Sequence, residues 1–122
     1  MEGVSRLVSF QNRERASCLA SRVHIAGTSA ERRRGLLDTT ELVDAGLWII
    51  PCEAIHTFGM KIAIDTVFLD KKLRVRKVKA SVQPGRIAVC ITAHSVLELP
   101  AGAIESSRTA VGDQLEMREV QA

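Results

Sequence analysis

The 122-residue chain is predicted to fold as an α+β protein that is mainly β, with short strands in a compact antiparallel or mixed sandwich or barrel. Short apolar runs of Val, Ile and Leu recur along the chain, and turn-forming Gly, Pro and Asp residues separate them. Only one segment carries a clear helix-start signature. A chain of this length forms one domain, so we expect residues 1–122 to be a single domain.

The first half of the chain contains the one clear helix that the sequence predicts. Thr28 and Glu31 have the spacing of a capping box, in which their side chains bind free amides at the start of a helix. We expect the helix to continue through Arg34 and to end near residues 35–37, followed by a turn or short helical turn at 38–46. Apolar runs on either side of this region predict strands over residues 4–10, 17–25 and 47–50.

The second half is predicted to consist of strands joined by turns. Turns are expected at residues 70–72, at Pro84–Gly85 and at Gly112–Asp113, where turn-forming residues interrupt the apolar pattern. The runs between them predict strands over residues 62–69, 73–81, 87–92, 95–99 and 114–117.

The charge distribution argues against nucleic-acid binding. The net charge is only +3, with 14 acidic and 17 basic residues interspersed. Residues 71–79 include six Lys or Arg, but no aromatic side chain lies among them to stack on bases. We therefore interpret this segment as a charged edge strand, which discourages aggregation between sheets.

The sequence also predicts the compartment and the state of the cysteines. No apolar run approaches the ~20 residues of a membrane span, and the N-terminus lacks the apolar segment of a secretory signal. The three cysteines, Cys18, Cys52 and Cys90, are odd in number and widely spaced, so a disulfide framework is not expected. We expect a soluble, cytoplasmic protein with reduced thiols that is a monomer or weak dimer.

Polar side chains inside apolar, strand-like segments are the main functional signal. His56, Thr57 and Asp65 lie in one such segment, and Glu98 lies in another much later in the chain. Because burial of an unpartnered polar group costs free energy, we expect these residues to share a ligand-binding site or a structural network. Arg32 in the predicted helix is a fifth candidate, able to pair with Glu98 or Asp65. The alternative for both carboxylates is a structural role, in which they accept bonds from the backbone of a nearby loop.

Two chemical alternatives involve cysteine. Cys52 and His56 could form the nucleophilic pair of a hydrolase or transferase, although Glu53 beside the thiol opposes thiolate formation. The Cys-x-x-x-His spacing of Cys52 with His56 and of Cys90 with His94 raises a zinc hypothesis. Residues four apart in a strand lie roughly 13 Å from one another, so the second pair is not expected to chelate. We expect a small-molecule- or protein-binding domain with no catalytic residue, metal ligand or cofactor.

Four short motifs occur in an order that resembles the domain-of-unknown-function family numbered 192. They are Glu31-Arg32-x-x-Gly35-Leu36-Leu37, Asp65 ahead of Phe68-Leu69-Asp70, Val96-Leu97-Glu98-Leu99-Pro100-Ala101-Gly102, and Gly112-Asp113. The resemblance covers about residues 21–117 and implies a compact, mainly β domain found in bacteria and archaea, with no established biochemical role. Residues 1–20 are expected to be a less family-like extension.

The chain departs from the family pattern at two places. Leu37 replaces the usual Met, and residues 56–60 replace a Trp-Met-x-Asn-Thr motif, so that only Asp65 carries over from that stretch. The resemblance implies that many relatives are secreted or membrane-anchored, which this N-terminus does not predict. The chain is therefore identified as a divergent branch of the family.

Overall fold

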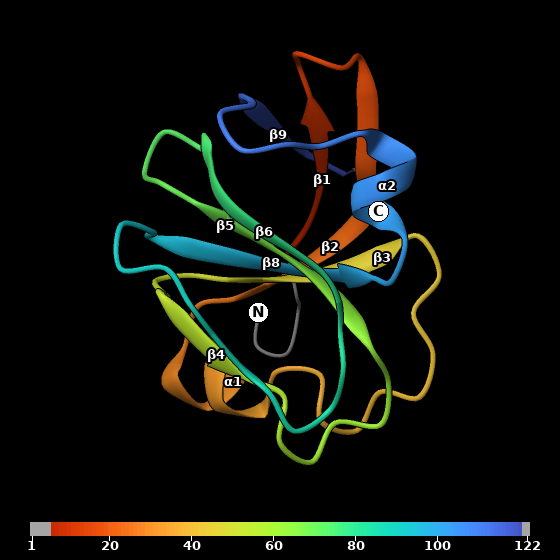
Figure 1. Cartoon of the computed structure of the whole chain (residues 1–122), viewed down its shortest axis with the longest axis vertical. Coiled ribbons are helices and arrows are strands. Elements are labelled where there is room, and N and C mark those ends of the chain that lie inside the picture. The colour runs from red at the N-terminus through yellow and green to blue at the C-terminus, as the bar shows by residue number, and fades with distance from the viewer. Residues whose placement is uncertain (1–5, 121–122) are drawn as a thin grey trace.

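Nine strands and two short helices make up residues 6–120, the part of the chain that the computed structural model describes (Figure 1). In chain order they are β1 (Leu7–Asn12), β2 (Ser17–Ala26), α1 (Ser29–Arg34), β3 (Ala45–Ile49), β4 (Ala54–His56), β5 (Ile64–Leu69), β6 (Val75–Val82), β7 (Ile87–Val89), β8 (Ser95–Pro100), α2 (Ala103–Ser107) and β9 (Leu115–Glu119). Neither helix has the length or the apolar character needed to cross a membrane.

Seven of the strands form one curled, mixed sheet. Their order is β6-β5-β8-β3-β2-β1-β9, and within it β2 and β3 are parallel whereas the other neighbours are antiparallel. The two outer strands approach each other at one end, where Val75 N donates to Asp113 O at 2.9 Å and Arg74 forms an isolated bridge with Gln114. The sheet is therefore a half-closed barrel, which confirms the predicted mainly β, α+β class.

A second, two-stranded sheet of β4 and β7 lies apart from the main one. Figure 1 shows β4 beside α1 at one end of the molecule, with α2 near the opposite end. Both α1 and β4 contribute residues to one cavity, so the two elements are neighbours in space. This small sheet and the helix together cover part of the main sheet.

Two apolar clusters lie on opposite faces of the main sheet, because successive strand side chains point to opposite sides. On β8, Leu97 and Leu99 belong to the larger cluster, together with Phe10 and Trp48. Val96 on the same strand belongs to the second cluster. Glu98 shares the face of Val96, so a carboxyl group stands on a largely apolar surface.

The local signals in the sequence place α1 correctly. Thr28 Oγ1 accepts from Glu31 N, and the Glu31 carboxylate accepts from Thr28 N in return, so the predicted capping box is present. The predicted strands at residues 17–25, 62–69, 73–81 and 95–99 correspond to β2, β5, β6 and β8. The first predicted strand begins at residue 4, which lies outside the described residues, and β1 continues to Asn12.

Three features of the second half differ from the prediction. The strand expected over 87–92 ends at Val89, and Cys90 to His94 form a turn in which Ala93 N donates to Cys90 O at 2.9 Å. The three-residue strand β4 lies in a segment where no strand was expected, because its pairing with β7 is long-range. A second helix, α2, begins shortly after Pro100 and was not predicted, because its N-cap residue Gly102 has no side chain to form a capping hydrogen bond.

Candidate functional site

A cavity of about 540 Å³ lies between α1, the segment that follows this helix, β4 and the main sheet. Its walls include five apolar side chains: Leu36, Leu37, Ile49, Ile55 and Met60. Its polar side chains include three arginines of α1, Cys52, His56 and Glu98. Apolar walls combined with polar groups at fixed positions are typical of small-molecule sites, as is this volume.

Glu98 is the most deeply buried polar residue of the cavity. Its side chain extends from β8 between Leu47 of β3 and Thr66 of β5, and only 3% of the residue is exposed. The Oε1 atom is buried and has no hydrogen-bond partner among residues 6–120. Because native folds satisfy nearly all buried polar groups internally, an unpartnered carboxyl group on a cavity wall needs an explanation.

Burial also changes the protonation of this carboxyl group. Removal from water raises the pKa of Glu98 from 4.5 to about 7. Near neutral pH the group therefore exists in both forms, and it can accept or donate a hydrogen bond.

Gly35 lies directly beside Glu98. A Cβ atom at this position would lie 3.8 Å from Glu98 Oε1, and the residue has a positive φ of 50°. The positive φ favours glycine, which lets the chain leave α1 and pass close to the carboxyl group. The Gly35-Leu36-Leu37 segment thereby forms one wall of the cavity.

Arg32 lies at the cavity but does not neutralise Glu98. Its Nη1 donates to Gly27 O at 2.7 Å and its Nη2 to Ser29 Oγ at 3.3 Å. No ion pair joins it to Glu98 or Asp65 within the described part of the chain, so the pairing considered from the sequence does not form. The arginine is held at the cavity by its own helix start.

Cys52 lines the cavity as a protonated thiol. Its Sγ donates to Ala54 O at 3.1 Å. Burial raises the pKa of Cys52 and the charge of Glu98 raises it further, whereas the backbone of Ala54 and the charge of Arg32 oppose these effects only in part. A catalytic cysteine needs the opposite shift, because the thiolate is the nucleophile.

His56 is exposed on β4 at the edge of the cavity. Its ring stacks on Phe58 with centroids 5.2 Å apart and an interplanar angle of 25°. Among residues 6–120 no side-chain hydrogen bond links this imidazole to Cys52 or Glu98. His56 can therefore contact a ligand at the cavity but does not act on the thiol.

Asp65 lies outside the cavity and is fully satisfied by the backbone. Its Oδ1 accepts from Ser81 N at 2.8 Å, and its Oδ2 accepts from Gly102 N at 3.1 Å and Ile104 N at 2.9 Å. The residue is completely buried. It thus binds the start of α2 to the irregular end of β6, as the structural alternative anticipated.

Thr57 is also buried and occupied by backbone groups. Its hydroxyl donates to Gln83 O at 2.7 Å and accepts from Arg86 N at 2.8 Å, which fixes the loop between β6 and β7. Of the five candidate residues, the structure thus brings Arg32, His56 and Glu98 to one cavity. Asp65 and Thr57 hold loops elsewhere.

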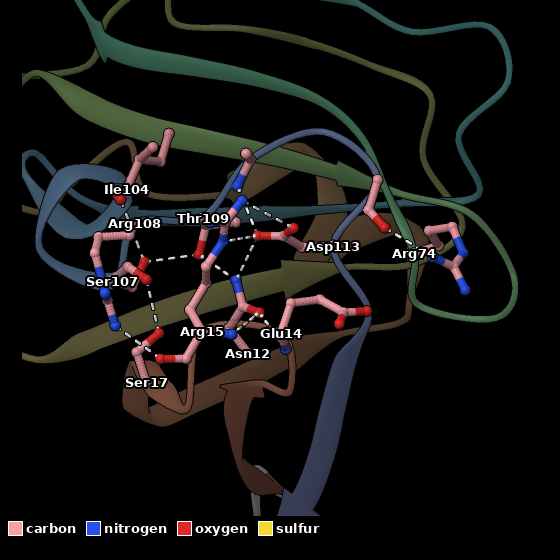
Figure 2. A network of polar contacts seen from close by, with 12 residues as sticks. Asn12, Glu14, Arg15, Ser17, Arg74, Ile104, Ser107, Arg108, Thr109 and Asp113 are labelled. Carbon is pink, nitrogen blue, oxygen red and sulfur yellow. Dashed lines mark hydrogen bonds and ion pairs between the residues drawn. The ribbon is translucent and has the colours of Figure 1, made fainter.

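A further polar network, which the sequence analysis missed, joins the β1–β2 turn to the loop before β9 (Figure 2). Asn12 Nδ2 donates to Thr109 Oγ1 and to Asp113 Oδ2, both at 3.0 Å, and Arg15 Nε donates to the same Asp113 oxygen at 3.0 Å. Burial would raise the pKa of Asp113, but the bonds that it accepts from Arg15, Asn12 and Ala110 N lower it. The network is internally satisfied, so it is structural; the Gly112-Asp113 motif was its only signal.

The described residues provide no cluster of side chains for the zinc site considered from the sequence. Among residues 6–120, no group of three or more His, Cys, Asp or Glu side chains is close enough to hold a metal ion. Cys52 and His94 do approach one another, since Cys52 N donates to His94 O at 2.8 Å and both residues line a second, smaller cavity.

Comparison with known proteins finds relatives over most of the chain. The model of the family DUF192, described as an uncharacterised ACR, matches residues 10–117. A UPF0127 protein from Thermococcus sibiricus (strain DSM 12597 / MM 739) is 32% identical over 111 residues, which cover 86% of this chain and 71% of that protein.

Two solved structures share the fold. A protein of unknown function from Novosphingobium aromaticivorans DSM 12444 superposes with a TM-score of 0.79 at 23% identity, covering 95% of this chain and 88% of the other. A protein from Sinorhizobium meliloti 1021, described as a candidate transcription regulator, gives a TM-score of 0.81 at 21% identity over 93% and 94% of the two chains. At these identities the likeness concerns the fold alone.

Proposed function

Because this chain belongs to the DUF192 family, which is described as uncharacterised, we propose its function from its own residues: it binds a small molecule, without catalysis, in the cavity at Glu98. The observation that carries this proposal is the unpartnered, 3% exposed carboxyl group of Glu98 on the wall of a 540 Å³ cavity. Such a group destabilises the fold unless something binds it. A ligand with hydrogen-bond donors would satisfy it.

The positions of Arg32 and His56 support the same site. Both residues line the cavity, and both were candidates from the sequence. The guanidinium of Arg32 is already fixed by two hydrogen bonds, so little side-chain entropy is lost when it contacts a ligand. His56 with Phe58 adds a stacked aromatic pair at the edge.

A Cys/His hydrolase or transferase receives less support. The raised pKa of Cys52 keeps the thiol protonated, and the sulfur donates its proton to a backbone carbonyl rather than to His56. A nucleophilic mechanism requires a base that accepts this proton. We therefore keep binding as the proposal.

Several basic side chains of residues 71–79 form hydrogen bonds within the fold. Residues 75–79 of this segment belong to β6, which is an outer strand of the main sheet as predicted. Lys77 Nζ donates to Val89 O at 2.7 Å, and Arg74 Nη1 donates to a carbonyl before β9, also at 2.7 Å. Arg76 Nε bonds a threonine hydroxyl at 3.3 Å. These internal bonds support the prediction that the segment is no nucleic-acid surface; the cytoplasmic location and the monomeric or weakly dimeric state also remain predictions.

A thermal-shift screen of small molecules tests the proposal. The wild type, Glu98→Gln and Glu105→Gln are screened against amines, carboxylates, sugars, nucleotides and metal ions. Glu105 is an exposed residue of α2 and serves as a matched control for the loss of one carboxylate. We expect compounds that raise the Tm of the wild type and of Glu105→Gln but not of Glu98→Gln. Stabilising compounds that act equally on all three proteins would contradict the proposed site.

A further inference from the structure

We infer that the ligand of the Glu98 cavity is a small zwitterion, whose cationic group contacts Glu98 and whose anionic group contacts Arg32. This inference rests on the proposed function and names the class of ligand. It follows from the distribution of charge in the cavity, whose lining combines one acidic group, three arginines and several apolar side chains.

The acidic part of the cavity lacks a cation from the protein. No ion pair to Glu98 exists among residues 6–120, and the carboxyl group receives no hydrogen bond there. A carboxylate offers acceptor sites for several N–H groups, and a charged donor forms the stronger bonds. Since burial already disfavours the ionised form of Glu98, an ammonium group would supply the charge that the fold does not.

The arginines give the cavity its anion-binding part. Arg34 pairs with Asp38 at 3.3 Å, whereas the bonds of the Arg32 side chain within residues 6–120 go to a backbone carbonyl and a serine hydroxyl. A guanidinium has five N–H donors, so Arg32 keeps donors for an incoming anion. A carboxylate can bind two of them at once.

The walls between these groups are suited to an apolar spacer. Leu36, Leu37, Ile49, Ile55 and Met60 line the cavity. A short methylene chain against these side chains gains hydrophobic free energy without unpaired polar groups. Amino-alkanoates combine the three parts: an ammonium group, a methylene chain and a carboxylate.

Isothermal titration calorimetry with three matched probes tests the inference. The probes are 6-aminohexanoate, hexanoate and hexylamine, which differ only in which charged end they carry. We expect 6-aminohexanoate to bind the wild type about tenfold tighter than either of the other two, since each lacks one charge-assisted contact.

Variants assign each end to its residue. Glu98→Gln should reduce the affinity for 6-aminohexanoate to that for hexanoate, and Arg32→Gln should reduce it to that for hexylamine. Arg32→Lys keeps the charge and should retain part of the preference for the zwitterion, which separates loss of charge from loss of helix structure. Arg118→Gln on β9 removes a charge that does not line the cavity and should leave all three affinities unchanged.

Two outcomes would overturn the inference. One is equal binding of hexylamine and 6-aminohexanoate, which would show that no anion-binding contact is made. The other is that none of the three probes binds, while an uncharged compound from the thermal-shift screen binds in a Glu98-dependent way. In that case the class of ligand is wrong but the proposed function stands. If all stabilising compounds are independent of Glu98, the proposed function itself fails.

Discussion

Asp65 and Glu98 are two buried carboxyl groups on paired strands, β5 and β8, and the protein surrounds them differently. In the register of these strands Asp65 lies opposite Leu99 and Glu98 opposite Thr66, so the two side chains point to opposite faces of the sheet. Asp65 accepts three backbone N–H bonds, whereas Glu98 Oε1 has no partner among the described residues. The contrast separates a carboxylate that stabilises the fold from one that is available to a ligand.

The largest expected effect concerns the satisfied carboxylate. Asp65→Ala leaves three backbone amides without their charged acceptor, and we expect the free energy of unfolding to fall by about 3–5 kcal/mol. Urea denaturation measures this loss. Asp38→Ala at an exposed ion pair is the control and should change stability by less than about 0.5 kcal/mol. Equal free energies of unfolding for Asp65→Ala and Asp38→Ala would contradict a structural role of Asp65.

The next effect concerns the pH dependence caused by Glu98. Its pKa is about 7 in the folded protein and 4.5 when unperturbed, so the folded state binds more protons between these values. The contribution of Glu98 protonation to the free energy of unfolding is therefore fully present below pH 4.5. It falls as pH rises from 4.5 through 7 and is constant above that, with a total loss of about 3 kcal/mol.

Glu98→Gln isolates this loss, because every other titrating group is common to both proteins. Urea denaturation between pH 4 and pH 8 should show the wild type becoming less stable relative to Glu98→Gln as pH rises. If the difference in free energy of unfolding between the two proteins is independent of pH, Glu98 does not titrate in this range. Glu98 would then not be a carboxyl group without protein donors, and it would not differ from Asp65 in this respect.

A smaller effect is expected in the polar network around Asn12 and Asp113. Asn12→Ala removes two donated and two accepted bonds of a buried amide, and we expect a loss of about 2 kcal/mol. In the described part of the chain the side chain of the neighbouring Gln11 makes one long contact, to a sulfur atom, so Gln11→Ala should cost less than about 0.5 kcal/mol. Comparable losses in both variants would show that this network adds nothing specific.

The smallest effect is local to the cavity. Helix α1 has no buried residue, so its capping box contributes a large part of its stability. Thr28→Ala should destabilise the helix by about 1 kcal/mol. Hydrogen exchange of the Gly35 amide, which donates to Glu31 O, should become about fivefold faster, since 1.4 kcal/mol corresponds to tenfold. Thr40→Ala, beyond the helix, is the control, and equal exchange in both variants would contradict this account of α1.

Local signals explain what the sequence could predict of the fold. The capping box lies within four consecutive residues, and apolar runs mark β2, β5 and β8 without knowledge of their partners. Long-range contacts explain what was missed. Helix α2 has no capping side chain of its own, because Asp65, 39 residues before Ile104, accepts the amide of its first turn.

The same limit applies to the candidate site. Asp65 and Glu98 look alike in sequence, since both are acidic residues in apolar runs. Their roles differ because the backbone donors of Ser81 and Gly102 reach one of them and not the other. Which face of a sheet a residue occupies, and which loop covers that face, depends on pairing that no short motif records.

The most direct test of the unpartnered state of Glu98 is an NMR titration of its side-chain carboxyl carbon, assigned by the loss of its signal in Glu98→Gln. A midpoint of about 7 is expected for a buried carboxyl group to which the protein supplies no donor. A midpoint at or below 4.5 would contradict the account, because it would show that the folded protein already stabilises the charged form.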